Sequence, residues 1–589
     1  MTIGEAQNTT DQGPSRADRL YGIAAAATLV GLAGLGLWLR LIGLRYGLPA
    51  VYNPDEVAIM NRAMAFGTGQ FNPHNFVYPT FYFYALFIWE GLTFGFAWLA
   101  TWVNSPSEFE RSFWVDPTLI YTSGRLLSVI CGVLTLFVVA RLGTRLFGRR
   151  TGLIAAGLLA VAPIAVRDAH YVKHDVPVTF LIVLTVAAAA SLLIDDYRHA
   201  TRGAWMRAGV LAGLAMSTHY YAIFVALPIV VAAIFGSRRG TRLRTLGYLA
   251  LAGAVAALTF FAGSPFLLVE PMTAWRDIVA NREIVMDGAV APGGPFASSS
   301  RYLYLLLLDG LGWPAGIAAV AGVGVALWRH WRRGLLLLAF PTAFLAFIAN
   351  TVPASRYLNP LLPFAAITAA IAIVAVAERA KGWGLAACIG VTALAGAPAL
   401  GASIRAGAFF RQADTRTLAH EMIVREVPAG ATVLVQPYSV PLRPTRESLI
   451  EGLRANLGSE DKATVKFRRQ LELKPYPAPA WRLIWLGTGG LDAEKIYVPL
   501  EAVNGPDPLA PLRARKVQYV VLKYNAEESA TAALRAALAA SGRLLATFAP
   551  YREDAGGQPA PAPFLHNTDA RIDAALARPG PPIEVWQIR

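Results

Sequence analysis

Long apolar runs separated by arginine-rich loops are the feature that most constrains this fold. The run from residue 21 to 39 would span about 30 Å as a helix, which matches the hydrocarbon core of a bilayer. Of the 589 residues, 55% are hydrophobic and only 15% are charged. A soluble protein of this size rarely has such a composition. The sequence therefore predicts an α-helical integral membrane protein.

The positive charge of the chain lies in the short loops between these runs. The formal net charge is +15, and Arg16 and Arg19 precede the first run, while four arginines between 141 and 150 follow the run at 118–140. Such loops mark the cytoplasmic side of a membrane protein. The pattern places residues 1–20 in the cytoplasm as an N-terminal tail and argues against nucleic-acid binding.

Counting the crossings gives a membrane domain from residue 21 to 404 with about eleven helices. The run at 80–102 is assigned to the outer surface as an interfacial or re-entrant element, because a crossing there would put the arginine cluster outside. The run at 207–238 is interpreted as two short helices that meet near His219. The outer loops predicted on this basis are residues 43–117, 167–175, 264–310 and 351–359.

Residues 405–589 have the composition of a soluble domain, and the crossing count puts this domain outside the cytoplasm. Apolar stretches at 432–436 and 517–522 predict buried strands. Strands that alternate with helices are typical of an α/β domain. Helices are predicted at 445–457 and 526–541, and further strands at 544–548 and 583–588.

Two adjacent acids, Asp55 and Glu56, follow the first apolar run, where the chain emerges on the outer side. One interpretation is structural: Asp55 follows Pro54 and suits the N-cap of a short helix over 56–66, and acids stabilise a helix start. The other is chemical. A partly desolvated carboxylate beside a membrane is a credible general base, a role worth roughly 10²–10⁴-fold in rate.

Two further outer turns carry cations that suit a phosphate group. The turn at 167–175 contains Lys173 together with an arginine, two histidines and two acids, although ordinary solvation of a loop would also explain these charges. The loop at 353–363 contains Arg356, and a lone arginine beside a membrane often only extends its side chain to water. Lysine binds phosphate as a point charge and arginine as a fork of donors.

These pieces occur in one order along the chain. They are Pro54-Asp55-Glu56, Tyr78-Pro79, Arg125-Leu-Leu-Ser, Arg145-Leu-Phe-Gly-Arg149, His170-Tyr171 to Asp175-Val-Pro177, and Ser355-Arg356-Tyr357 with Pro360 and Pro363. Each is short, but the ordered set over residues 20–405 resembles the GT-C fold glycosyltransferases. The resemblance is to the branch of protein O-mannosyltransferases and the aminoarabinose transferase of lipid A.

The resemblance implies that a sugar passes from a polyprenyl-phosphate carrier to an acceptor. Asp55 matches the acid expected to deprotonate the acceptor hydroxyl, and Glu56 matches the adjacent acid that orients the acceptor or supports Asp55. Asp175 matches an acid that some relatives use around a divalent metal, so the resemblance leaves Mg²⁺ or Mn²⁺ open. The candidates for binding the donor phosphate are Arg356, Tyr357, Lys173 and His170, and those for contacting substrate are Tyr78, His74 and His174.

We therefore expect an inverting glycosyltransferase of the inner, cytoplasmic membrane that acts on the outer face, with Asp55 as general base. Its partners would be a polyprenyl-phosphate sugar, a lipid, glycan or protein acceptor, and the bilayer. The alternative is a transporter or flippase of lipid-linked sugars, which more typically has an inverted repeat and ionisable residues at the bilayer midplane. The sequence has no such repeat and its charges gather at one face. Residues 405–589 differ from the sugar-binding insert of eukaryotic mannosyltransferases. We therefore do not assume that this chain shares the protein acceptor of those relatives.

Overall fold

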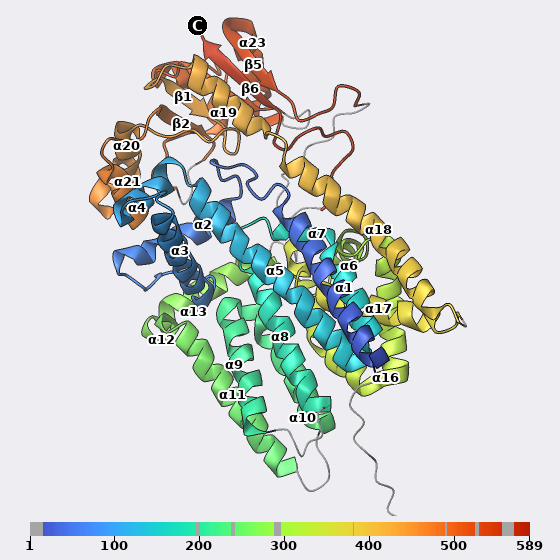
Figure 1. The fold of residues 1–589 in the computed structure, drawn as a ribbon. Coiled ribbons are helices and arrows are strands. Elements are labelled where there is room, and N and C mark those ends of the chain that lie inside the picture. The colour runs from blue at the N-terminus through green and yellow to red at the C-terminus, as the bar shows by residue number, and fades with distance from the viewer. Residues whose placement is uncertain are drawn as a thin grey trace, which may run out of the picture.

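The computed structural model has a helical bundle and, beyond one end of it, a domain built on a sheet (Figure 1). The structure describes residues 16–194, 201–236, 242–287, 296–380, 382–488, 492–524, 529–555 and 570–589. Most of the predicted N-terminal tail, and residues 288–295 of the predicted loop at 264–310, lie outside these residues.

Apolar helices form the bundle, as the composition predicts. Six segments of the described chain are long and apolar enough to cross a membrane, by length and composition, and the protein is a multi-pass membrane protein. The expected count of about eleven crossings stays a prediction. The helices of the bundle are α1 (Arg16–Leu41), α5 (Thr118–Phe147), α6 (Arg149–Ala160), α8 (Asp175–Ile194), α9 (Arg202–Thr218), α10 (Ala226–Gly236), α11 (Arg242–Gly263), α16 (Trp313–Ile348), α17 (Leu362–Ala377) and α18 (Gly384–Phe410).

The expected break in the run at 207–238 is present. The helices α9 and α10 are separate and are joined by a 3₁₀ helix, Tyr220–Val225. His219 precedes that 3₁₀ helix in an extended conformation, with φ −157° and ψ 133°. The break therefore puts a histidine and two tyrosines at the ends of two apolar helices.

Shorter helices connect the long ones, and Figure 1 shows α2 and α4 between the bundle and the sheet domain. The predicted helix at 56–66 is confirmed as α2, and it begins two residues earlier because Pro54 suits the first turn of a helix. The run at 80–102 forms α3, which is not among the six candidate spans. The short helices are α2 (Pro54–Ala65), α3 (Phe81–Leu99), α4 (Pro106–Val115), α7 (Pro163–Asp168), α12 (Phe266–Val269), α13 (Pro271–Arg282) and α15 (Ser299–Tyr304).

The C-terminal domain is a six-stranded sheet with strand order β3-β2-β1-β4-β6-β5. The first four strands in this order are parallel, and β6 runs antiparallel to both β4 and β5. The four predicted strands are confirmed, whereas β2 and β3 were not predicted. The strands are β1 (Thr432–Val435), β2 (Arg482–Leu486), β3 (Tyr497–Val498), β4 (Tyr519–Lys523), β5 (Gly542–Phe548) and β6 (Ile583–Ile588).

Helices cover both faces of this sheet. Alternate residues of β1 point to opposite faces, so Val433 packs with α19 in one core and Leu434 packs with α22 and α23 in the other. Burial on both faces explains why these strands read as continuous apolar runs. The helices are α19 (Thr415–Glu426), α20 (Arg446–Leu457), α21 (Val465–Glu472), α22 (Ala510–Ala514) and α23 (Ala532–Ser541).

Polar contacts fix the sheet domain to the loop that precedes α2. The Tyr46 hydroxyl donates to Asp414 over 3.0 Å, and the Tyr52 and Thr417 hydroxyls lie 2.6 Å apart. The guanidinium of Arg416 lies 3.7 Å from the centre of the Tyr52 ring. The start of α2 is therefore held from both sides, by the bundle and by the C-terminal domain.

Candidate active site

The start of α2 presents Asp55 at the end of the bundle that faces the sheet domain. The Asn53 side chain accepts a hydrogen bond from the backbone N–H of Asp55 over 3.1 Å, so Asn53 is the N-cap. The interpretation of Asp55 as N-cap is therefore wrong. The physical reason is that Pro54 takes the first helical position, which moves the cap to the residue before it.

Two cations from different segments approach Asp55. The Lys173 ammonium lies 2.7 Å from Asp55 Oδ2, and Arg356 Nη1 lies 3.8 Å from the same oxygen. Lys173 also lies 3.5 Å from Asp175 Oδ2. The Asp55 side chain is 38% exposed, whereas those of Lys173 and Asp175 are 3% exposed. The fold thus brings three predicted segments together and leaves Asp55 as the accessible acid among them.

Aromatic and imidazole rings pack beside these charges. The ring of His174 lies 4.1 Å from Tyr78 and 4.8 Å from His219, and His219 lies 3.7 Å from Tyr221. Among the described residues, Asp175 Oδ1 and Oδ2, His174 Nδ1 and the Tyr221 hydroxyl have no hydrogen-bond partner. Buried polar atoms of this kind are costly without a partner. We call Asp55, Tyr78, Lys173, His174, Asp175, His219, Tyr221, Arg356 and Tyr357 the Asp55 cluster.

His219 and Tyr221 were not predicted as site residues. They come from the break between α9 and α10, far along the chain from Asp55. A signal was present, because ionisable residues that interrupt an apolar run in a membrane protein are often functional.

The electrostatics of the turn at 173–174 follow from its burial. Burial lowers the pKa of Lys173, and the nearby Arg356 guanidinium lowers it further, while Asp175 and Asp55 raise it. Burial, then the Lys173 and Arg356 charges, hold the pKa of His174 well below its usual range. His174 is therefore a neutral imidazole near pH 7.

A hydrogen-bond network holds Arg356 in place. Arg356 lies in a short 3₁₀ helix, Ser355–Leu358, whose first residue accepts a hydrogen bond from Arg167 over 3.0 Å. Arg167 in turn lies 2.7 Å from Asp168. The Arg356 guanidinium stacks on Tyr357, 4.9 Å from the ring centre. The predicted pair of Arg356 and Tyr357 is thus attached to the turn that carries Lys173.

Glu56 differs from its neighbour Asp55 because it is fully buried. Its two carboxylate oxygens accept from Arg125 Nε and Nη2 over 2.9 Å each, and Oε1 also accepts from the backbone N–H of Val172 over 2.9 Å. Glu56 therefore connects α2 to α5 and to the turn that carries Lys173. This arrangement gives it no open oxygen for a substrate.

Two of the predicted histidines lie away from the Asp55 cluster. His170, a candidate for the donor phosphate, has Nδ1 2.9 Å from the Val166 carbonyl and Nε2 2.8 Å from the Ile42 carbonyl. Because both ring nitrogens face backbone carbonyls and the residue is buried, it has no face for a phosphate. His74, a candidate for substrate contact, is 66% exposed and pairs with Glu270 over 2.6 Å.

The metal expectation rested on Asp175. Within the described residues, no group of three or more His, Cys, Asp or Glu side chains is placed to hold a metal ion. The cation that lies beside Asp175 in this structure is the ammonium of Lys173, 3.5 Å away.

Residues 121–267 match the family model described as dolichyl-phosphate-mannose-protein mannosyltransferase. Over this segment the chain is similar to that family of glycosyltransferases. The matched segment contains Lys173, His174, Asp175, His219 and Tyr221 of the Asp55 cluster, and covers less than half of the chain. No curated protein sequence matches the chain.

Solved structures of membrane glycosyltransferases share its chain trace only distantly. ArnT from Cupriavidus metallidurans bound to undecaprenyl phosphate has a TM-score of 0.49 at 14% identity, over 96% of this chain and 98% of that one. The archaeal oligosaccharyltransferase AglB from Archaeoglobus fulgidus, in complex with an inhibitory peptide and a dolichol-phosphate, has a TM-score of 0.46 at 15% identity, over 86% and 70%. Both TM-scores lie below 0.5, and these likenesses do not bear on the chemistry of the site.

Proposed function

We propose that this glycosyltransferase moves a sugar from a polyprenyl-phosphate donor to an acceptor hydroxyl, with inversion at the anomeric carbon. The observation that carries the proposal is the partly exposed Asp55 carboxylate between Lys173 and Arg356, two cations with which a phosphate would pair.

In the proposed reaction, Asp55 accepts the proton of the acceptor hydroxyl. The acceptor oxygen attacks the anomeric carbon from the side opposite the phosphate, a bond forms to that carbon, and the bond from it to the phosphate oxygen breaks. Polyprenyl phosphate leaves with the electron pair. General base catalysis of this kind contributes roughly 10²–10⁴-fold to a rate.

Lys173 and Arg356 would stabilise the charge that develops on the leaving phosphate. In the structure both cations form ion pairs with Asp55 Oδ2. A phosphate that draws these two cations toward itself would release Asp55 to accept a proton. Donor binding would thereby prepare the base for the acceptor.

Tyr78, His174, His219, Tyr221 and Tyr357 would contact the transferred sugar. Their rings offer apolar faces, and His174 Nδ1 and the Tyr221 hydroxyl, which have no hydrogen-bond partner among the described residues, can bind hydroxyl groups. The neutral His174 imidazole can either donate or accept.

Glu56 and His170 would act as positioning residues. Glu56 holds α2 and the Lys173 turn through Arg125 and the Val172 amide. His170 joins the end of α7 to the loop after α1 through the Ile42 carbonyl. We place the site on the outer face of the cytoplasmic membrane, with the C-terminal domain on the same side, from the positive loops on the opposite side.

The test is release of free polyprenyl phosphate by the purified protein, supplied with a lipid extract that contains polyprenyl-phosphate sugars. A transferase releases it when an acceptor is added, whereas a transporter moves the intact donor and releases none. The proposal is overturned if the purified protein releases no free polyprenyl phosphate when the extract contains every donor and acceptor of the source membrane.

A further inference from the structure

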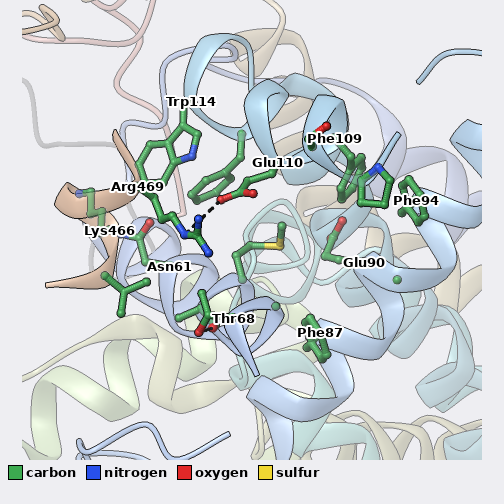
Figure 2. Close-up of a pocket in the computed structure, with 18 residues that line it drawn as sticks. Asn61, Thr68, Phe87, Glu90, Phe94, Phe109, Glu110, Trp114, Lys466 and Arg469 are labelled. Carbon is green, nitrogen blue, oxygen red and sulfur yellow. Dashed lines mark hydrogen bonds and ion pairs between the residues drawn. The ribbon is translucent and has the colours of Figure 1, made fainter. Parts of the chain in front are cut away.

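Two residues with unpartnered buried polar atoms, Glu90 and Trp114, line a cavity of about 430 Å³ that shares no lining residue with the Asp55 cluster (Figure 2). Asn61, Met64, Ala65 and Thr68 contribute to its wall, at the spacing of one face of a helix. Asp55 does not fall on that face and lies nearer the start of α2. The cavity volume is within the range of small-molecule sites in proteins.

Both parts of the molecule build this cavity. Residues of α2, α3 and α4 form most of its wall, and Lys466 and Arg469 of α21 in the C-terminal domain close one side. Arg469 lies 3.8 Å from Glu110 of α4. The aromatic residues of the wall are Phe87, Phe94, Phe109, Phe113 and Trp114.

Glu90 is the unusual residue of the cavity. It lies on α3, it is 1% exposed, and neither carboxyl oxygen has a hydrogen-bond partner in the described part of the chain. Burial raises the pKa of Glu90 to about 9, so its carboxyl both donates and accepts near neutral pH. A buried polar group without partners destabilises a fold, so its presence in a native protein calls for an explanation.

Trp114 supplies a second unpartnered atom. Its indole Nε1 is buried and has no acceptor among the described residues, and Figure 2 shows Trp114 and Glu90 on opposite sides of the cavity. A ligand that pairs with both groups must accept a hydrogen bond from the Trp114 indole. It must also donate to and accept from the Glu90 carboxyl on the other side.

This requirement separates the classes of occupant. An acyl chain would leave both groups unpartnered. An organic cation would suit the aromatic rings, but it offers no acceptor to Trp114, and Lys466 and Arg469 would repel it. A sugar ring has hydroxyl groups that donate and accept, and its C–H faces pack on aromatic rings.

We infer that this cavity binds a neutral carbohydrate, through hydrogen bonds to Glu90 and Trp114 and ring contacts to the surrounding phenylalanines. It is a second sugar site, separate from the Asp55 cluster and shared between the membrane domain and the C-terminal domain. Its occupancy does not depend on sugar transfer at Asp55.

The test is binding to a printed array of neutral mono- and oligosaccharides. The full chain is held in phospholipid nanodiscs, because glycoside detergents would themselves present sugars. We expect binding that Glu90→Leu and Trp114→Phe each weaken at least tenfold. Ile88→Ala, on the same helix but 64% exposed, and Asp55→Asn keep wild-type binding.

Glu90→Leu also separates a binding role from a folding role. Because it removes a buried polar group, its melting midpoint should equal or exceed that of the wild type while its binding is lost. Trp114→Phe keeps one aromatic ring and removes the indole N–H together with the second ring. The inference is overturned if no neutral glycan binds, if both variants bind as the wild type does, or if tetramethylammonium binds in a Glu90-dependent manner and glycans do not.

Discussion

Glu56 and Asp55 are adjacent in sequence, and the structure predicts opposite consequences for their loss. Arg125 is 1% exposed. Its Nε and Nη2 each donate a hydrogen bond of 2.9 Å to Glu56, and its Nη1 donates to the Leu44 and Tyr46 carbonyls over 2.8 Å each. Glu56→Gln keeps the volume but leaves the buried guanidinium without its counter-charge. Breaking a buried pair in this way costs about 3–5 kcal/mol.

Glu56→Gln should therefore lower the melting midpoint of the protein in nanodiscs. Because Glu56 also accepts from the Val172 amide beside Lys173, hydrogen exchange at residues 171–173 should become faster, and sugar transfer should fall as a consequence of lost order. The matched control is Glu460→Gln. Glu460 also binds the Nε and Nη2 of an arginine, Arg454, but that pair lies on the surface, where an ion pair contributes little to stability.

A second arm tests the reason for the loss. Glu56→Leu combined with Arg125→Leu removes both charges, and replacement of a buried pair by apolar residues is often tolerated. The double variant should be more stable than Glu56→Leu alone. A Glu56→Gln protein with wild-type melting and wild-type exchange at residues 171–173 would refute the assignment of Glu56 to positioning.

Three further predictions concern the Asp55 cluster and its surroundings. Arg356→Ala should raise the KM for the lipid-linked donor at least tenfold, and Arg356→Lys should recover part of the loss; an unchanged KM in Arg356→Ala would contradict the phosphate role. Lys173 binds phosphate only when protonated, and its pKa is lowered, so kcat/KM should fall as the pH rises, starting below the usual lysine range. Lys173→Arg should move that fall to higher pH. An unmoved profile would exclude Lys173 as the group that causes the fall. His170→Asn should lower the melting midpoint and leave the donor KM unchanged, so a raised KM at wild-type stability would restore His170 as a phosphate ligand.

Periodicity and charge were enough to predict much of the fold. The helix over 56–66, the break near His219 and the strands at 432–436 and 583–588 follow from local signals, because proline, polar interruptions and apolar runs act over a few residues. The strand β2 (Arg482–Leu486) was missed, since five residues in a proline-rich stretch form a strand only through pairing with β1.

The site could be predicted only in part, because burial and pairing are decided by distant segments. Asp55, Lys173 and Arg356 carry charges that suit the chemistry, and the fold brings them together. His170 carries the same signal but is occupied by two carbonyls. His219 and Tyr221 were missed because their proximity to His174 depends on how α8 and α9 pack. The interrupted apolar run marks His219 and Tyr221 as candidates, but only the packing of the helices shows which candidates meet at the site.

Asp55→Asn tests whether the Asp55 carboxylate is the general base. The substitution keeps the size of the side chain and removes its capacity to accept a proton, while the Asn53 cap of α2 binds the backbone of residue 55 and stays intact. We predict that the melting midpoint falls less than in Glu56→Gln, because the Asp55 side chain is 38% exposed and Lys173 keeps Asp175 at 3.5 Å. Acceptor-dependent release of polyprenyl phosphate should fall at least a hundredfold, within the range of a lost general base. Wild-type release by Asp55→Asn would contradict the central claim.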